Sequence, residues 1–443
     1  MSLPPAYPAG HPGAFASQLD VSEPALPGYT RTTTAVWDVP PPEQEHFFYL
    51  TAKKTGKRWL TLSVLSRAAS ATDPPTFYQG ARVTGNLRLD LDKEELVDEI
   101  SLSLYGKVSI FSHSTSNFFY ASQRMYSAAE QNTDSVSSVT SSLKRGRLKG
   151  RFEWPYSLRL PKGVSILSSI TIDGKTEREN YRLPPSFSDE QSKVFVQYSL
   201  VVRVNRGGFK TGSKLVVPLT YVPLARPSPP TVLRQLAYQE DHPLVGPDGD
   251  PDGWKVLGPV RFDGVLFKSV PIEVECTLHI SKPLTYARGG PIHTLISIDC
   301  NNRQFLDLIT PQSIHFTLVQ RVTFGEAPQK TRFSERLAAQ ITVKTYEWAS
   351  ASWWNVALGD GPQAHSRKAF AGELLIPDHL VPACHILHYG HEYELAFYAL
   401  SAIGFVPGIP HTKALLLEPV AIVTAFAQGP RPRSYLPPGY DVP

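Results

Sequence analysis

The chain has 443 residues, and 42% of them are hydrophobic, which is enough to bury the cores of two or three domains. The net charge of +4 is too small to favour nucleic-acid binding on charge alone, so no nucleic-acid partner is expected. Three cysteines, Cys276, Cys300 and Cys384, cannot all pair and form no Cys-x-x-Cys motif, which favours a reducing compartment.

The sequence shows no pattern typical of a signal peptide or a membrane span. Residues 1–20 are polar and rich in proline, unlike a secretory leader. The longest apolar run, 414–427, is interrupted by Glu418 and Pro419 and is too short to cross a bilayer. We therefore expect a soluble, intracellular protein.

The first half of the chain reads as a tail followed by a sheet-forming block. Residues 1–45 contain many proline steps without periodicity and are predicted to be disordered. Beyond them, polar and apolar residues alternate, which leaves one face of each strand exposed to solvent and is typical of antiparallel sheets. The strands expected in this block, 46–222, are 46–50, 59–65, 83–91, 100–108, 152–161, 195–204 and 214–221.

Turns and an insert separate these strands. Asp173-Gly174 and Gly207-Gly208 predict hairpins. Residues 127–143 are rich in serine and are predicted to be a disordered insert.

A second sheet-forming block, 254–427, follows a linker at 223–253 that is rich in proline and glycine. No stretch predicts an amphipathic helix of three turns, although 335–339 is compatible with one short turn. The fold class is therefore all-β, with two tandem immunoglobulin-type β-sandwiches and disordered proline-rich termini, the second at 428–443. The clearest strands of the second block are 272–280, 294–300, 314–324, 339–348 and 393–400.

Both tails carry the pattern Pro-Pro-x-Tyr. Two prolines hold the backbone near polyproline II, so the segment reaches a partner already extended and loses little entropy on docking. WW domains read such segments with an aromatic groove for the prolines and a pocket for the tyrosine. Shuffling this composition gives roughly 0.15 matches per chain. The two matches are Pro4, Pro5 and Tyr7, and Pro437, Pro438 and Tyr440, while Leu26, Pro27 and Tyr29 form a weaker relative.

The two blocks resemble the α-arrestin family of trafficking adaptors. In the first block the resemblance is carried by 85–89, 100–106, Phe152-x-Trp154-Pro155-Tyr156-Ser157-Leu158-x-Leu160-Pro161, Leu183-Pro184-Pro185-Ser186-Phe187, and a strand that ends at Arg203. In the second block it is carried by Gly289-Gly290-Pro291-Ile292.

This resemblance implies two arrestin-like domains, N-terminal and C-terminal, in a cytoplasmic adaptor peripheral to the plasma membrane or endosomes. Such an adaptor binds the cytoplasmic tails of membrane transporters or receptors. Its Pro-Pro-x-Tyr motifs recruit a WW-domain HECT-type ubiquitin ligase, which promotes ubiquitination and endocytosis of the cargo. Two departures from the family are the very short tail after the second block and the absence of a leucine-rich clathrin-binding box.

A basic cluster follows the serine-rich insert and comprises Lys144, Arg145, Arg147, Lys149 and Arg151. One interpretation is a docking site for anionic lipid headgroups or for an acidic cargo tail. The other is the solvated end of a loop. Phosphorylation within 135–142 would neutralise the cluster locally.

Three patterns suggest metal or phosphate binding but are better explained as structural. Asp248, Asp250 and Asp252 resemble the start of an EF-hand loop, but Pro259 occupies the position of its bidentate glutamate. Gly174-Lys175-Thr176 resembles the end of a phosphate-binding loop, but Ser169 replaces its first glycine. His385, His388 and His391, near Glu392, would point to different faces of a strand.

We therefore expect no cofactor, no metal and no enzymatic activity. Two alternatives stay open: a retromer-type arrestin-like sorting scaffold without ligase recruitment, and a β-sandwich enzyme or carbohydrate-binding module. Trp353-Trp354 is the one hint of the latter, and it is explained more simply by hinge or core packing.

Overall fold

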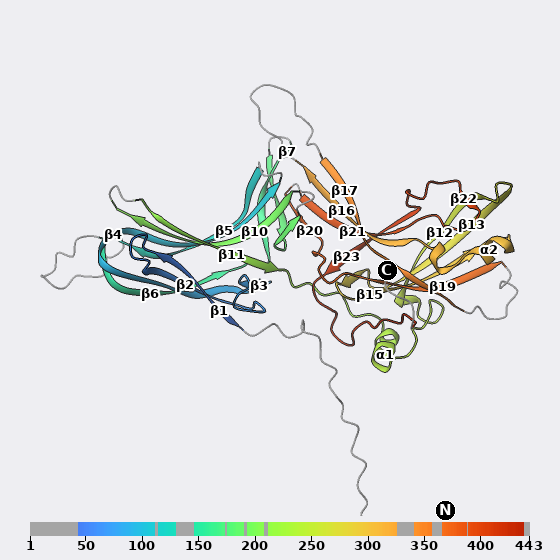
Figure 1. The fold of residues 1–443 in the computed structure, drawn as a ribbon, viewed down its shortest axis with the longest axis horizontal. Helices are drawn as coiled ribbons and strands as arrows, with labels where there is room; N and C mark the ends of the chain where they lie inside the picture. The colour runs from blue at the N-terminus through green and yellow to red at the C-terminus, as the bar shows by residue number, and fades with distance from the viewer. Residues whose placement is uncertain are drawn as a thin grey trace, which may run out of the picture. The chain divides into compact units, whose positions relative to one another are not determined.

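The computed structural model describes residues 43–110, 114–129, 146–172, 175–189, 193–207, 211–325, 341–356, 366–387 and 389–437. Within these ranges the chain is almost entirely β-structure, and its curled sheets form β-sandwich-like domains (Figure 1). The predicted all-β sandwich class is confirmed. We call the strands β1–β11 the first sandwich and the strands β12–β23 the second sandwich.

Every segment predicted as a strand in this block overlaps a strand of the first sandwich, which contains other strands as well. Its strands are β1 (Gln44–Thr51), β2 (Arg58–Ser66), β3 (Thr76–Tyr78), β4 (Arg82–Ile110), β5 (Ser114–Ser127), β6 (Arg147–Arg159), β7 (Gly163–Ile172), β8 (Lys175–Arg182), β9 (Phe187–Asp189), β10 (Val194–Arg206) and β11 (Ser213–Val222). β7 pairs with β8 and β10 with β11, as the two predicted hairpins require. Ser127, which we placed in the serine-rich insert, is instead the last residue of β5.

One long strand, β4, connects the two halves of the curled nine-stranded sheet of the first sandwich. Its first part pairs with β2 and β6, and its second part, from Val97 onward, pairs with β10 and, from Glu99 onward, with β5. Two separate strands at 83–91 and 100–108 were predicted, and this was wrong. The polar residues between them do not form a turn, because a shift in register between Leu91 and Glu95 lets the strand continue.

The motifs that carry the family resemblance have structural roles in the first sandwich. Gly85 lies against β2, where an added Cβ would come 2.0 Å from the carbonyl oxygen of Ser63, so only glycine fits. The hydroxyl of Tyr156 donates to the same carbonyl at 2.8 Å. The Tyr198 hydroxyl donates to the carbonyl of Pro184 at 2.7 Å, which fixes the buried Leu-Pro-Pro segment beside β10.

The second sandwich contains two six-stranded sheets. Their strand orders are β18-β19-β15-β13-β12-β22 and β14-β23-β21-β16-β17, with β20 beside β21. The strands are β12 (Trp254–Leu266), β13 (Val270–Ser281), β14 (Thr285–Ala287), β15 (Pro291–Asp299), β16 (Phe316–Gly325), β17 (Ile341–Ser350), β18 (Ser352–Asn355), β19 (Arg367–Leu375), β20 (Cys384–Ile386), β21 (Tyr389–Phe397), β22 (Phe405–Pro407) and β23 (Leu416–Val423).

A helix that the sequence did not predict lies in the linker. α1 (Val232–Glu240) begins after Thr231, whose hydroxyl accepts from the Arg234 amide at 3.4 Å, and ends at Asp241 in the left-handed conformation. The other helices in the described ranges are α2 (Arg303–Leu308), η2 (Pro251–Gly253) and η3 (Pro311–Ser313). None of the helices described here has the length and apolar character needed to cross a membrane. The short predicted turn at 335–339 lies outside the described residues.

Candidate functional site

The segment that leads into the second Pro-Pro-x-Tyr motif is the part of the predicted ligand that the structure describes. Pro437 is half-buried, whereas the remaining motif residues lie outside the described ranges. Those residues are Pro4, Pro5, Tyr7, Leu26, Pro27, Tyr29, Pro438 and Tyr440. We call residues 424–437, which follow β23, the tail segment.

The start of the tail segment is hydrogen-bonded to the beginning of the linker. The Thr424 hydroxyl donates to the carbonyl of Pro223 at 2.6 Å and accepts from the amide of Ala225 at 3.1 Å. Arg226 then donates to the carbonyl of Phe426 at 3.0 Å. Two proline-rich stretches that are far apart in the sequence therefore run together on the second sandwich.

A second attachment lies close to the motif and uses a buried pair of polar side chains. His293 on β15 and Glu373 on β19 are directly opposite each other in the strand register. His293 Nε2 lies 2.7 Å from the carbonyl oxygen of Arg433, and the amide of Tyr435 donates to Glu373 Oε2 at 2.8 Å. We call His293 and Glu373, with Tyr238 and Asp241 of the α1 region, the tail seat.

The α1 region completes the tail seat. The Tyr238 hydroxyl lies 3.3 Å from His293 Nδ1, and the Arg433 guanidinium pairs with Asp241 at 3.0 Å. The rings of His293 and Tyr435 have centroids 5.4 Å apart. Because the carbonyl of Arg433 can only accept, His293 carries its proton on Nε2 and accepts from Tyr238 through Nδ1.

Burial controls the charges of the tail seat. Burial of His293 lowers its pKa to about 4, so its imidazole is neutral at pH 7. Burial also raises the pKa of Glu373, while hydrogen bonds from Ser434 and Tyr435 oppose that shift. The pair, with Nε2 and Oε2 3.9 Å apart, is therefore not a salt bridge near neutral pH. Within the seat the tail is held by hydrogen bonds between its backbone and His293 and Glu373, together with the exposed ion pair of Arg433 and Asp241.

Arg234 lies beneath the same region. Its side chain is buried over the Trp254 ring at 4.6 Å, and burial lowers its pKa. Arg234 Nε, Arg234 Nη2 and the Tyr435 hydroxyl are buried and have no hydrogen-bond partner in the described part of the chain. The tail therefore covers polar groups that would otherwise be solvated.

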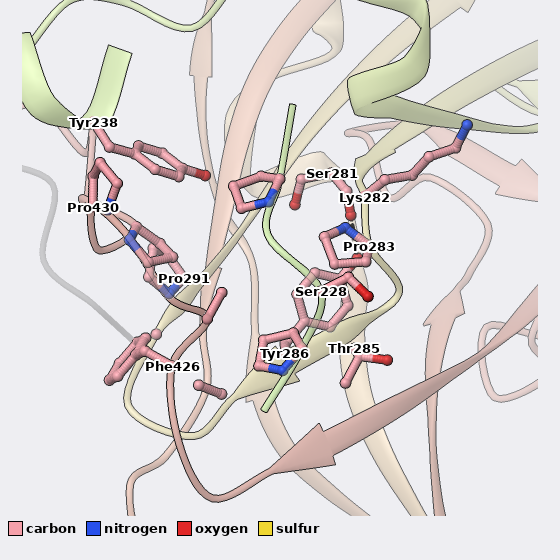
Figure 2. Close-up of a pocket in the computed structure, with 16 residues that line it drawn as sticks. Ser228, Tyr238, Ser281, Lys282, Pro283, Thr285, Tyr286, Pro291, Phe426 and Pro430 are labelled. Atoms are coloured by element: carbon pink, nitrogen blue, oxygen red, sulfur yellow. Dashed lines mark hydrogen bonds between the residues drawn. The ribbon is translucent and has the colours of Figure 1, made fainter. Parts of the chain in front are cut away.

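A small cavity of about 50 Å³ lies between the linker and the tail segment. Figure 2 shows Tyr238, Phe426 and Pro430 on one side of it and Pro283 and Tyr286 on the other. This volume holds a few water molecules and is far below that of a metabolite pocket. Its wall is mostly proline and aromatic rings, so we interpret it as a packing seam. The sixteen lining residues come from the linker, α1, the β13–β14–β15 region and the tail segment.

The basic cluster carries less free charge than its sequence suggests. Lys144 and Arg145 lie outside the described residues, while Arg147, Lys149 and Arg151 are exposed on β6. Arg147 pairs with Glu94 at 3.3 Å, and Arg151 pairs with Asp90 at 3.3 Å. Both carboxylates belong to β4, so the sheet partly neutralises the predicted anion-docking surface.

One aspartate of the linker, Asp250, has a structural role in the fold. Asp250 is buried and accepts from the Thr231 hydroxyl at 2.6 Å, which connects the two ends of the loop around α1. A Cβ at residue 253 would come 2.1 Å from Asp250 Oδ2, which explains Gly253. In the segment that resembles an EF-hand loop, Asp250 therefore closes the loop around α1 instead of binding an ion.

The histidines near β20 and β21 face opposite sides. Cys384 opposes His391 in the register, so His385 points away from His391. His385 pairs with exposed Glu392 at 3.2 Å, whereas His391 is buried, and His388 lies outside the described residues. No group of three potential metal ligands occurs among the residues that were placed.

Two remaining patterns are also explained by packing. Trp353 is buried and its ring lies 6.2 Å from that of Phe316, which supports the interpretation as core packing. Lys175 and Thr176 begin β8 in its hairpin with β7, while Gly174 lies outside the described residues.

Sequence reasoning missed the tail seat. His293 and Glu373 each stand among apolar residues of a strand, and only the pairing of β15 with β19 brings them together. The sequence does show a single polar residue within each of these apolar strands. That pattern alone does not show which residue or segment the polar side chain contacts.

No protein-family model matches the chain, and no curated protein does either.

Proposed function

We propose that this chain is a non-enzymatic cytoplasmic trafficking adaptor of the arrestin type. Its proline motifs recruit a WW-domain HECT-type ubiquitin ligase, and its sandwiches bind the cytoplasmic tail of a membrane transporter or receptor. The observation that best supports this proposal is the position of Pro437. It directly follows a segment whose backbone is fixed by His293 and Glu373, and it is itself half-buried rather than part of a core.

This arrangement suits a ligand for a polyproline-binding groove. A motif close to a fixed point samples fewer orientations than one on a long tether, so less entropy is lost when it docks. Only Leu436 separates Tyr435, whose amide is hydrogen-bonded, from the first motif proline. The second sandwich thereby sets the direction from which the ligase approaches.

The N-terminal motif adds avidity. Single WW contacts are weak, and two motifs that engage a ligase with several WW domains raise the overall affinity by roughly 10²–10⁴. Residues 8–45 supply the tether for the first motif. The two motifs therefore differ in their tethers, one long and one short.

Cargo binding is the less defined part of the proposal. An acidic cargo tail or an anionic membrane surface is the partner that suits the basic cluster. The pairing of Arg147 and Arg151 with β4 carboxylates leaves Lys149 as the described member for which no ion pair is seen. We therefore expect this contribution to be modest and sensitive to salt.

The test is binding of the full chain to an array of WW domains. Wild-type chain should bind, and the double variant Tyr7→Ala plus Tyr440→Ala should lose most of its binding. Tyr29→Ala is the matched control, since it removes a tyrosine from the weaker motif and should change little. Equal binding by wild type and the double variant would overturn the ligase-adaptor proposal.

A further inference from the structure

Ser434 occupies an unusual position in the tail segment. It is exposed, yet it lies between the two residues whose backbone groups are bound by the tail seat. Its hydroxyl oxygen accepts from the Leu436 amide at 3.3 Å, and its proton is directed at the carboxylate of Glu373, which is only 6% exposed. One accessible hydroxyl therefore touches the buried group that holds the tail.

Modification of this hydroxyl would act directly on that contact. A phosphoryl group adds a charge of about −1.5 to −2 and replaces the donating proton with acceptor oxygens. Both the phosphate and Glu373 would then present acceptors and negative charge to each other in a partly buried place, where repulsion is poorly screened. Glu373 would lose one donor and face a dianion, so its bond to the Tyr435 amide would be strained as well.

The nearby cations have other contacts. Arg433 pairs with Asp241 at 3.0 Å, and Arg234 is buried over Trp254. Arg431 lies 4.6 Å over the Phe426 ring. Repulsion from Glu373 should therefore outweigh attraction to these arginines while the tail stays seated.

The flanking sequence also suits a modifying enzyme. Arg431 and Arg433 stand three residues and one residue before Ser434, and the surrounding backbone is neither helix nor strand. A protein kinase with an acidic substrate groove would recognise this arrangement by charge complementarity.

We propose that Ser434 is a phosphorylation site and that its phosphorylation releases residues 433–437 from the tail seat. In the transfer, Ser434 Oγ bonds to the γ-phosphorus of a nucleoside triphosphate as the bond to the leaving nucleoside diphosphate breaks. The hydroxyl proton passes to the base of the kinase. Release frees the chain on which Pro437 stands, so it also regulates WW binding, a consequence that rests on the proposed function.

The decisive measurement is amide hydrogen exchange on the full chain with phosphoserine installed at position 434. Exchange at Tyr435, whose amide donates to Glu373, should rise on the order of tenfold or more, the loss expected when a buried charged hydrogen bond is broken. Phosphoserine installed at Ser269, an exposed residue of the β12–β13 turn, is the matched control and should leave tail exchange unchanged. Unchanged or slower exchange after phosphorylation of Ser434 would overturn the inference.

A second variant tests the cause. In the chain with phosphoserine at 434, Glu373→Gln removes the facing charge, so phosphorylation should accelerate tail exchange less than it does with Glu373 present. An equal acceleration in both backgrounds would contradict repulsion by Glu373.

WW binding separates this inference from the proposed function. If phosphorylation accelerates tail exchange while neither form of the chain binds any WW domain, the modification site stands and the ligase proposal fails. If the unmodified chain binds through Tyr440, as a Tyr440→Ala variant shows, and phosphate leaves exchange unchanged, the ligase proposal stands and the Ser434 inference fails.

Discussion

Two histidines of the second sandwich are almost fully buried, and burial lowers the pKa of each to about 4. His391 is enclosed by parts of the sheets: the Tyr389 hydroxyl at 3.0 Å, the Val381 carbonyl at 3.3 Å, and the ring of Phe187 from the first sandwich at 5.7 Å. His293 instead contacts the tail, through the carbonyl of Arg433 at 2.7 Å. One histidine joins two cores, whereas the other holds a segment outside them.

A buried, neutral histidine therefore has a different structural role at each of the two sites. Among the described residues, the partners of His391 belong to strands or to loops between strands, so loss of a contact damages the core. Around His293 the tail supplies a carbonyl and an aromatic ring, so loss of a contact exposes the seat and leaves the sheets intact. We expect mutations at the first site to lower global stability and mutations at the second to change local protection.

The largest expected contrast is between the tyrosines beside the two histidines. Tyr389 is buried and packs on Phe187, so Tyr389→Ala should lower the free energy of unfolding by about 3–5 kcal/mol. Tyr435 is half-buried on the tail, so Tyr435→Ala should cost less than about 2 kcal/mol. Thermal and urea unfolding of both variants measure the difference, and equal losses would show that the tail belongs to the cooperative core.

Acid should destabilise the protein through both histidines. Each folded pKa lies below the unfolded value of 6.5, so the unfolded state binds the extra proton, and stability falls as pH drops from about 6.5 to about 4. The full effect is roughly 3 kcal/mol for each histidine. Urea unfolding across this range measures it.

The acid response should also separate the two sites. Burial raises the pKa of Glu373, and this favours the folded state at lower pH, so it partly cancels the slope at His293. Glu373→Gln should therefore steepen the fall in stability towards acid, whereas His391→Gln should flatten it. Equal pH dependence in wild type and Glu373→Gln would mean that the charges around His293 are assigned wrongly.

A smaller and local effect is expected from removing the carboxylate of the tail seat. Glu373→Ala leaves the Tyr435 amide without its acceptor, which should accelerate amide exchange at that residue by roughly tenfold to a hundredfold. Glu392→Ala is a matched control, because Glu392 pairs with exposed His385 on the same sandwich. If the amide of Tyr435 exchanges as slowly in Glu373→Ala as in the wild type, Glu373 does not hold the tail.

The smallest effect is expected at the surface ion pair of the tail. Arg433 and Asp241 are 42% and 70% exposed, so Arg433→Ala should change stability by less than about 1 kcal/mol. Arg261→Ala removes a similarly exposed pair with Glu275 and should behave alike in urea unfolding. A much larger loss for Arg433→Ala would indicate that the ion pair, rather than the backbone bonds, holds the tail.

Local pattern in the sequence was sufficient to predict most strands. Alternating residues such as Leu60, Leu62 and Val64 are fully buried on β2, as the polar-apolar period implies. The continuity of β4 was not predictable in this way, because a polar stretch within a strand resembles a turn. Helix α1 was hidden among prolines, although Thr231 provided a start signal.

The tail seat could not be predicted, for a different reason. Its two central residues become neighbours only through the pairing of β15 with β19, and its ligand is the backbone of a segment that follows the last strand. Local patterns carry no information on such register. The motif itself was visible in the sequence, whereas its anchoring was not.

The serine-rich insert leaves and re-enters the first sandwich at neighbouring points of β4. On one side the amide of Ala128 donates to the carbonyl of Asp98 at 2.9 Å, and on the other the amide of Val97 donates to the carbonyl of Gly146 at 2.7 Å. Since adjacent residues clamp both ends, the span between the ends does not depend on how many residues lie between them. Insertions, deletions and substitutions in this stretch should therefore be tolerated, because the entropic cost of closing the loop grows only with the logarithm of its length. The same clamp makes it a natural place to insert a reporter domain.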